Sequence, residues 1–218
     1  MNDSSFPLAS EVSAPDLVRR SLSYTSSPVL SEYLEQTPDD GHLVHLRLSE
    51  VRLPPEAQAY FSAYTEVVNL IALVSDLLPD RVGVLPLWWR IAEQCPRADI
   101  RVLTELDRDR LELLMGDEGL AELASLELPQ LLILDDEWHL QAQWGPRSVA
   151  ADALLERWVS VHPDYEVLAE AEDSQSLEEL ARLNRVLAID MRIWHNSGLD
   201  AETSTEIQAL LASLLEEA

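Results

Sequence analysis

The stretch that decides the fold is Val67–Pro86, VVNLIALVSDLLPDRVGVLP. It begins with an eight-residue run in which only Asn69 is polar, the pattern of a β-strand covered on both faces. A polar turn follows at residues 75–81, and a helix is predicted at 84–94. In open α/β sheets, ligands bind at the carboxyl end of such a strand. This turn is therefore the first candidate for a functional site.

The turn has no pattern of a common catalytic site. It contains no cysteine, no Ser–His pair, no glycine-rich phosphate loop and no cluster of metal ligands. The sequence therefore indicates where a site should lie, but not what chemistry it performs.

Strand and helix patterns alternate after this turn. Strands are predicted at residues 98–103 and 129–134, and a tight acidic turn leads to a returning strand at 138–144. Helices are predicted at 107–115, 121–128 and 148–161. The order β-α-β-α-β-β-α predicts an α/β fold with a mixed sheet and helices on both of its faces.

The segment before the sheet is mostly helical in pattern. Residues 1–13 resemble a tail, and helices are expected at 14–24, 28–36 and 54–65. Residues 37–41, TPDDG, predict a turn. Residues 42–51 alternate in polarity and are interpreted as extended, with a helix as the alternative.

Two long helices end the chain. After an acidic linker at 166–174, Ser176 and Glu179 have the spacing of a capping box. The helix that they open ends at Asn196-Ser197-Gly198, and Asp200 caps the last helix. The apolar stripes of these helices predict an αα-hairpin that packs on the rest of the protein. We therefore expect an N-terminal tail and helical region, a central α/β domain, and a linker with a helical hairpin, at residues 1–53, 54–162 and 163–218.

The composition is that of a globular protein with a strong acidic excess. The 218 residues include 40 acidic and 15 basic side chains, a formal net charge of −25, and every basic residue is arginine. Such a surface repels phosphate backbones, so direct nucleic-acid binding is not expected. The excess either serves solubility or marks an acidic decoy for a basic partner.

The sequence is typical of a reducing compartment. Cys95 is the only cysteine, so no intramolecular disulfide can form. The first residues lack the basic start and apolar core of a secretory signal, and no run reaches the ~18 apolar residues of a membrane span. We expect a soluble, cytoplasmic protein that does not bind membranes.

Several short motifs occur in a fixed order between residues 54 and 160. They are Ser75-Asp76-Leu77-Leu78-Pro79-Asp80, Leu85-Pro86, Leu103-Thr104-Glu105-Leu106-Asp107-Arg108-Asp109 with Leu114-Met115, Glu127-Leu128-Pro129, and Trp144-Gly145-Pro146-Arg147. Their order and spacing resemble a bacterial thioredoxin-like family with an N-terminal helical region and a helical tail. In that family the first motif is an acidic-Asp-Trp-Cys-Gly-Asp turn. The resemblance implies a thioredoxin-like fold.

The chain departs from that family at the reactive position. The nucleophilic cysteine of the family corresponds to Leu78, which cannot supply the thiolate that attacks a disulfide. The resemblance also implies a cis peptide bond before Pro129, in a loop that lies against the active-site turn. An apolar patch bordered by Asp80 and Arg81 would then offer a groove to a peptide or protein partner. Its members are Leu77, Leu78, Pro79, Leu128 and Pro129. The alternative to a retained groove is evolutionary drift, in which the leucines only fill the space that the active site once occupied.

The remaining reactive side chains favour structural roles. Cys95 lies at the far end of the 84–94 helix, away from the positive helix end that lowers a thiol pKa. Asp76, Asp80 and the acids at 135–137 lack the pattern of a calcium loop, and the five histidines lack metal-site spacing. No metal and no cofactor are therefore expected.

These observations predict a redox-inactive thioredoxin-fold protein that binds a protein or peptide partner as a scaffold, adaptor or complex subunit. Binding would use the remnant groove or the helical extension, and the C-terminal helices could also form a homo-oligomer. An oxidoreductase or transferase that uses Cys95 is the alternative, and an acidic decoy for a basic partner is a third hypothesis.

Overall fold

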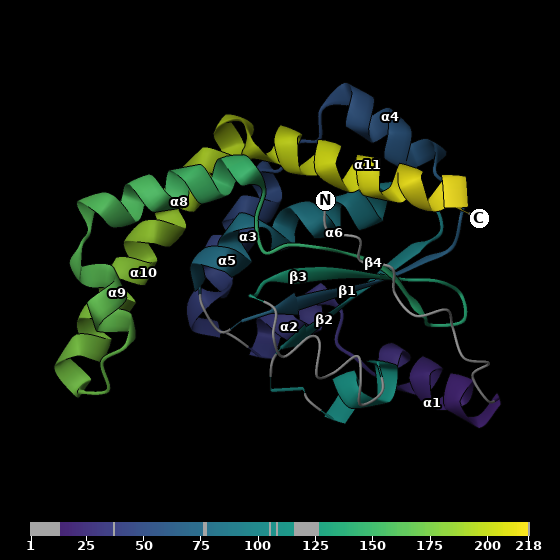
Figure 1. Ribbon diagram of the computed structural model, residues 1–218, viewed down its shortest axis with the longest axis horizontal. Helices are drawn as coiled ribbons and strands as arrows, with labels where there is room; N and C mark the ends of the chain where they lie inside the picture. Colours follow the sequence, from purple (N-terminus) through teal and green to yellow (C-terminus); the bar gives the residue numbers. More distant parts are fainter. Residues whose placement is uncertain are drawn as a thin grey trace.

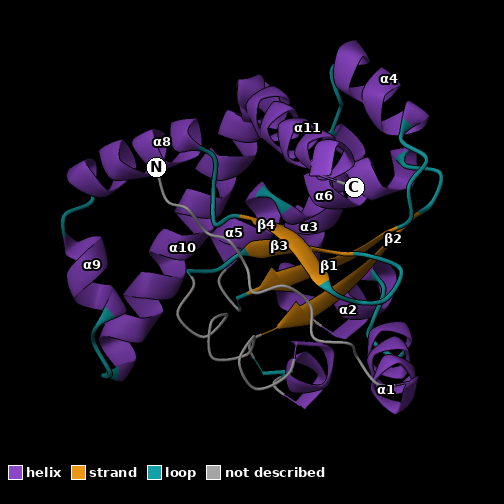
Figure 2. Cartoon of the chain, turned by 45° about the vertical axis from the view of Figure 1, so that its right-hand side comes forward, coloured by secondary structure: helices purple, strands orange, loops and turns teal. Residues whose placement is uncertain are grey.

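The centre of the fold is a four-stranded mixed sheet. The computed structural model describes residues 14–36, 38–75, 78–104, 106–107, 109–115 and 127–217. The strands are β1 (Val68–Val74), β2 (Ala98–Thr104), β3 (Gln130–Leu134) and β4 (Leu140–Trp144). β1 is parallel to β2 and antiparallel to β3, and β4 is antiparallel to β3. The order β2-β1-β3-β4 places β1 inside the sheet (Figure 2), as its apolar run, interrupted only by Asn69, predicts.

Helices surround this sheet and extend beyond it (Figure 1). They are α1 (Ala14–Thr25), α2 (Leu30–Gln36), α3 (Pro38–Glu50), α4 (Pro55–Ala63), α5 (Leu78–Gly83), α6 (Leu85–Gln94), α8 (Val149–Val161), α9 (Asp164–Ala169), α10 (Ser174–Trp194), the π-helical turn η1 (His195–Leu199) and α11 (Asp200–Glu217). Residues 109–115 are also helical. The mixed sheet with flanking helices confirms the predicted α/β class.

Both faces of β1 are buried because its side chains alternate between two cores. Leu70 and Ala72 lie in the larger core, which includes side chains of α3, α4, α6 and α11. Ile71 and Leu73 lie in a smaller core with Tyr24 of α1 and the 109–115 helix. The single polar side chain of β1 is satisfied, since Asn69 Nδ2 donates to Asp135 O at 2.7 Å.

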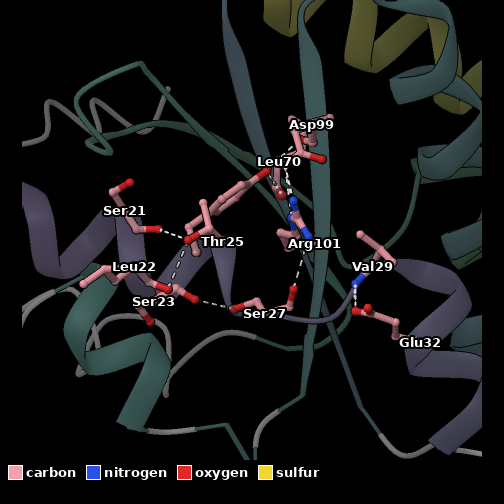
Figure 3. Close-up of polar contacts among 11 residues, drawn as sticks. Ser21, Leu22, Ser23, Thr25, Ser27, Val29, Glu32, Leu70, Asp99 and Arg101 are labelled. Atoms are coloured by element: carbon pink, nitrogen blue, oxygen red, sulfur yellow. Dashed lines mark hydrogen bonds and ion pairs between the residues drawn. The ribbon is translucent and has the colours of Figure 1, made fainter.

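The segment between α1 and α2 covers the outer edge of β2. Val102 N donates to Pro28 O at 2.9 Å across this edge. Arg101 pairs with Asp99 and donates to Ser27 O (Figure 3). The Val102 contact occupies a backbone N–H that an open edge would offer to another strand, and the Arg101 contact holds the covering segment in place.

Two sequence predictions for the N-terminal region are wrong. Helix α3 begins at Pro38, so residues 38–41 are helix rather than turn, and the segment at 42–51 is helix through Glu50 rather than extended. Proline is tolerated in the first helical turn. Val44 and Arg47 lie one turn apart and are both buried, a helical spacing that the alternating polarity concealed. The helical alternative for this segment is confirmed.

Two predictions for the C-terminal region are also wrong. Helix α9 occupies much of the predicted acidic linker, because Tyr165 and Leu168 pack beside Trp158. Helix α10 begins at Ser174 rather than at a cap on Ser176, since the Asp173 carboxylate accepts hydrogen bonds from the backbone N–H groups of residues 175 and 176. The longer helix gains a cap that the capping-box pattern did not identify.

The predicted pair of C-terminal helices is present but open. Helices α10 and α11 meet at a kink where Gly198 has φ 147°. Before the kink, α10 packs on α5 and α9. After it, α11 packs on α4, α6 and β4 (Figure 1). The two helices therefore pack on different elements instead of along each other as an αα-hairpin.

The larger core draws side chains from all three predicted segments, for example Val44, Trp88 and Ile207. The divisions at residues 53 and 162 stay a prediction. The helix predicted at 121–128 falls largely on residues 121–126, outside the described residues.

Candidate functional site

The carboxyl end of β1 leads into α5, where the sequence predicted an open turn. Pro79 stands in the first turn of this helix, where its missing N–H is not needed. Pro79, Asp80 and Arg81 are all buried. Asp76, Leu77 and the side chain of Leu78 lie outside the described residues.

Two proline loops meet near this helix. The Leu128–Pro129 and Gly145–Pro146 peptide bonds are both cis, and the first is the isomer that the resemblance implies. Gly145 has φ 145°, and a Cβ added there would lie 2.4 Å from Pro129 O. Only glycine fits this position, because any side chain would collide with the backbone of the other loop.

Arg147 follows the second loop and joins three elements in one ion cluster, the Arg147 clamp (Asp80, Glu127, Arg147 and Asp152). Its guanidinium nitrogens lie 3.4 Å from Asp80 Oδ1, 2.8 Å from Glu127 Oε1 and 3.4 Å from Asp152 Oδ1. The side chains of Arg147 and Asp80 are 12% and 8% exposed, whereas those of Glu127 and Asp152 reach solvent. The clamp thus combines three carboxylates with one cation.

The clamp alters the acidity of its buried member. Burial raises the pKa of the Asp80 carboxyl to about 6; Arg147 opposes this rise and Glu127 adds to it. Asp80 therefore keeps its proton to a higher pH than an exposed aspartate does.

Asp80 and Arg147 also line a narrow pocket between α5, α8 and α10, with Trp194 and His195 in its wall. His195 Nδ1 lies 3.0 Å from Asp200 Oδ1, and Asp200 pairs with the buried Arg47. Burial lowers the pKa of His195, and Arg47 acts in the same direction while Asp200 opposes it. The ring is thus neutral at pH 7, and its Nδ1–H donates a hydrogen bond to Asp200 Oδ1.

The structure places the predicted groove residues mainly in the interior. Pro129 is buried, and Leu128 is half-buried beside the smaller core. Arg81 Nη1 donates to Tyr33 OH at 3.2 Å and ties α5 to α2. Asp80 is linked to the Leu128–Pro129 loop through Arg147 and Glu127.

Cys95 lies at the C-terminal end of α6 and is buried. Burial raises the pKa of its thiol to about 11. This end of a helix carries the negative side of the dipole, which does not stabilise a thiolate. The thiol is therefore protonated at neutral pH.

Sequence reasoning missed Arg147, His195 and Asp200 as site residues. A signal existed for Arg147, because it ends the Trp-Gly-x-Arg motif. No comparable signal existed for His195 and Asp200, since their environment depends on the kink at Gly198 and on Arg47, 153 residues before Asp200.

Histidine, cysteine and carboxylate side chains of the described residues form no group of three or more that could hold a metal ion. Within the same part of the chain, no helix has the length and apolar character needed to cross a bilayer. The absence of a metal and of a cofactor stays a prediction.

Comparison with known proteins identifies the family. A family profile described as thioredoxin matches residues 28–159. A crystal structure of an HIV epitope scaffold has a TM-score of 0.55 at 12% identity, covering 88% of this chain and 97% of that chain. A protein of unknown function from Pseudomonas aeruginosa has a TM-score of 0.54 at 14% identity, covering 88% and 95%. No curated protein matches. Because the profile spans more than half of the chain, including the whole sheet and the Arg147 clamp, this chain belongs to the thioredoxin family.

Proposed function

We propose that this protein is a thioredoxin-family binding protein without thiol–disulfide chemistry, acting as a scaffold, adaptor or complex subunit. The observation that carries the proposal is the state of its single thiol. Cys95 is buried, and its pKa of about 11 leaves a thiolate fraction on the order of 10⁻⁴ at pH 7. Thiol–disulfide exchange needs an accessible thiolate.

Two described residues of α5, Asp80 and Arg81, make contacts within the protein. Asp80 is held in the Arg147 clamp, and Arg81 donates to Tyr33. Among the described residues of this region, Leu128, Glu127 and Asp152 form an accessible rim. A partner would meet this rim, because the other described members of the predicted patch are buried.

The redox part of the proposal is tested by reduction of insulin disulfides with dithiothreitol as the electron donor. We expect no acceleration over dithiothreitol alone, and turnover comparable to that of an active thioredoxin would overturn the proposal. The same insulin assay with a thioredoxin that has both active-site cysteines serves as the positive control.

The alternative role of Cys95 as a nucleophile is tested by alkylation with iodoacetamide at pH 7.5. We expect the folded protein to react at least roughly 100-fold more slowly than the unfolded chain, because burial both shields the thiol and suppresses its ionisation. Equal rates in the two states would favour the Cys95-dependent enzyme.

The binding part is tested by affinity capture from the native host with Leu128→Glu. The matched control is Leu215→Glu, which adds the same charge to an exposed leucine on α11. We expect a specific partner to be lost with Leu128→Glu and kept with Leu215→Glu. A partner that both variants retain would place the binding surface away from the rim.

A further inference from the structure

The outer face of the second half of α10 differs in charge from the chain as a whole. Helices α8, α9 and α10 extend beyond the sheet at one side of the molecule (Figure 1). Four side chains of this half point away from the helices behind them and form the α10 strip: Arg185, Ile189, Arg192 and Ile193. The single acid between residues 185 and 194 is turned inward, where Asp190 Oδ2 accepts a hydrogen bond from Trp158 Nε1 at 2.9 Å.

The strip has an apolar centre. Ile189 and Ile193 stand one turn apart on the helix and are 45% and 51% exposed. The opposite side of α10 is already covered, because Leu187 and Met191 pack around Trp158. A single exposed isoleucine is ordinary on a protein surface, whereas two neighbours between arginines form a continuous apolar contact.

Both arginines of the strip have hydrogen-bond donors to offer. Arg192 donates from Nε and Nη2 to the carboxylate of Glu50, which fixes the guanidinium and leaves three of its five N–H groups for other acceptors. Arg185 is exposed, and it makes no hydrogen bond or ion pair with any residue that the structure describes. With Glu50 included, the strip keeps an excess of one positive charge.

The charge of the whole chain limits what this strip can bind. A nucleic acid or an anionic membrane would extend past the strip and meet a molecule with a net charge of −25. A short acidic segment avoids that repulsion. Arg185 and Arg192 are two turns apart, roughly 10 Å along the helix axis, so carboxylates spaced by seven residues on a second helix would match them.

We propose that the α10 strip binds an acidic amphipathic helix of a protein partner. The apolar side chains of that helix pack on Ile189 and Ile193, and its flanking carboxylates pair with Arg185 and Arg192. This inference goes beyond the proposed function, which places a partner at the rim of Leu128, Glu127 and Asp152. It holds whether or not that rim binds anything.

The test is a titration of a fluorescent peptide with the full chain at pH 7.5, followed by anisotropy. The peptide has about 16 residues, with leucine along one face of the helix and glutamate on both flanks of that face. We expect saturable binding that weakens between about 0.05 M and about 0.5 M salt, because exposed charge pairs are screened. Absence of saturation at the lower salt concentration would overturn the proposal.

Three further peptides define the chemistry of the ligand. Lysine in place of glutamate should abolish binding, and glutamine in its place should weaken binding roughly 10-fold. Glutamate without the leucine face should also bind roughly 10-fold more weakly. Equal binding of the glutamine peptide would contradict the role of the arginines, and equal binding of the peptide without leucine would contradict an amphipathic ligand.

Substitutions on the exposed surface locate the site with little risk to folding, which circular dichroism checks. Arg185→Glu should weaken binding roughly 10-fold, whereas Arg157→Glu, the same change on an exposed arginine of α8, should leave it unchanged. The double variant Ile189→Ser with Ile193→Ser should have an effect of similar size. Its control replaces two other exposed apolar side chains by serine, Val161 and Val167. Equal effects within either pair would contradict the α10 strip as the site.

Leu128→Glu separates this proposal from the one for the rim. We expect this variant to bind the acidic peptide as the native chain does, even where it loses a partner captured from the host. Loss of the peptide in Leu128→Glu but not in Arg185→Glu would place the acidic ligand at the rim and overturn the assignment to α10.

Discussion

Arg47 is fully buried and Arg147 is only partly buried, and the two arginines also differ in how many carboxylates surround them. Arg47 is 0% exposed and pairs with the single carboxylate of Asp200, and its Nε and Nη1 have no hydrogen-bond partner among the described residues. Arg147 is 12% exposed and shares its guanidinium among three carboxylates. The guanidinium of Arg47 therefore lacks hydrogen-bond acceptors, whereas the three carboxylates around Arg147 share a single cation.

This difference separates a structural junction from a candidate binding site. Arg47 joins α3 to the junction of α10 and α11, away from water, where removing one member of a charge pair is costly. The Arg147 clamp is open to solvent through Glu127 and Asp152, which also belong to the rim proposed for partner binding, so water can hydrate its excess carboxylates.

The largest effect is expected for Arg47→Met. At pH 8 it should lower the free energy of unfolding by about 3–5 kcal/mol, because it leaves the Asp200 carboxylate buried without its cation. The loss should shrink towards pH 6, since burial and Arg47 both lower the pKa of His195, and without Arg47 only burial opposes a proton on the imidazole beside Asp200. Urea unfolding followed by tryptophan fluorescence measures both values.

The paired control is Arg47→Met combined with Asp200→Asn. If the uncompensated carboxylate causes the loss, this double variant regains more than half of the lost stability. A double variant as unstable as Arg47→Met would show that packing of the arginine stem, and not its charge, stabilises the junction.

The next effect is the titration of Asp80. Its pKa in the folded state is about 6, above the ordinary 3.8, so its stabilising contribution is complete below pH 4 and is lost as the pH rises through 6. The change amounts to about 3 kcal/mol at most. Arg147 and Glu127 face this carboxyl, and Tyr165 lies within its field.

The measurement is the difference in unfolding free energy between the native chain and Asp80→Asn from pH 4 to pH 8. Relative to this variant, which cannot titrate at the same position, the native chain should lose stability up to about pH 6 and then change no further. A difference that is constant over the whole range would contradict the raised pKa.

Arg147→Met should cost less than Arg47→Met, about 1–3 kcal/mol at pH 7.5. Asp80 can take up a proton once its cation is removed, because its pKa is already about 6. Glu127 and Asp152 reach solvent and can be hydrated. Unfolding in urea under the same conditions gives the comparison. If the order of the two variants were reversed, burial would not be what distinguishes the two arginines.

The parts of the fold that could be predicted rest on local patterns. The apolar run of β1 needs only its own residues to indicate burial on both faces. Helices α3 and α5 were assigned to turns or an extended segment because Pro, Asp and Gly favour turns locally. Burial of Val44 and Arg47 against distant elements outweighs that preference.

The candidate site was predictable in position but not in chemistry. Asp80 was named from the sequence, yet its raised pKa follows from burial, which Arg147, 67 residues away, opposes and to which Glu127 adds. The partners of His195 likewise depend on how α10 and α11 meet. Such long-range contacts leave no periodic signal in one sequence, so only the folded chain shows them.

The smallest effect is expected for Glu50→Gln, which tests a second link between α3 and α10. Glu50 pairs with Arg192 through two hydrogen bonds and accepts one from Asn196, and these contacts lower its pKa to about 2. Because this value is below the ordinary 4.5, the contribution of Glu50 is present above pH 4.5 and is lost as the pH falls through 2. Both partners of this pair are partly exposed, so the loss at pH 7 should be about 1 kcal/mol or less. The pair and the Arg47 cluster connect α3 to neighbouring parts of the same helical junction and differ mainly in burial. A loss in Glu50→Gln as large as that in Arg47→Met would therefore mean that connecting the helices, and not burying the charge, sets the energy of this junction.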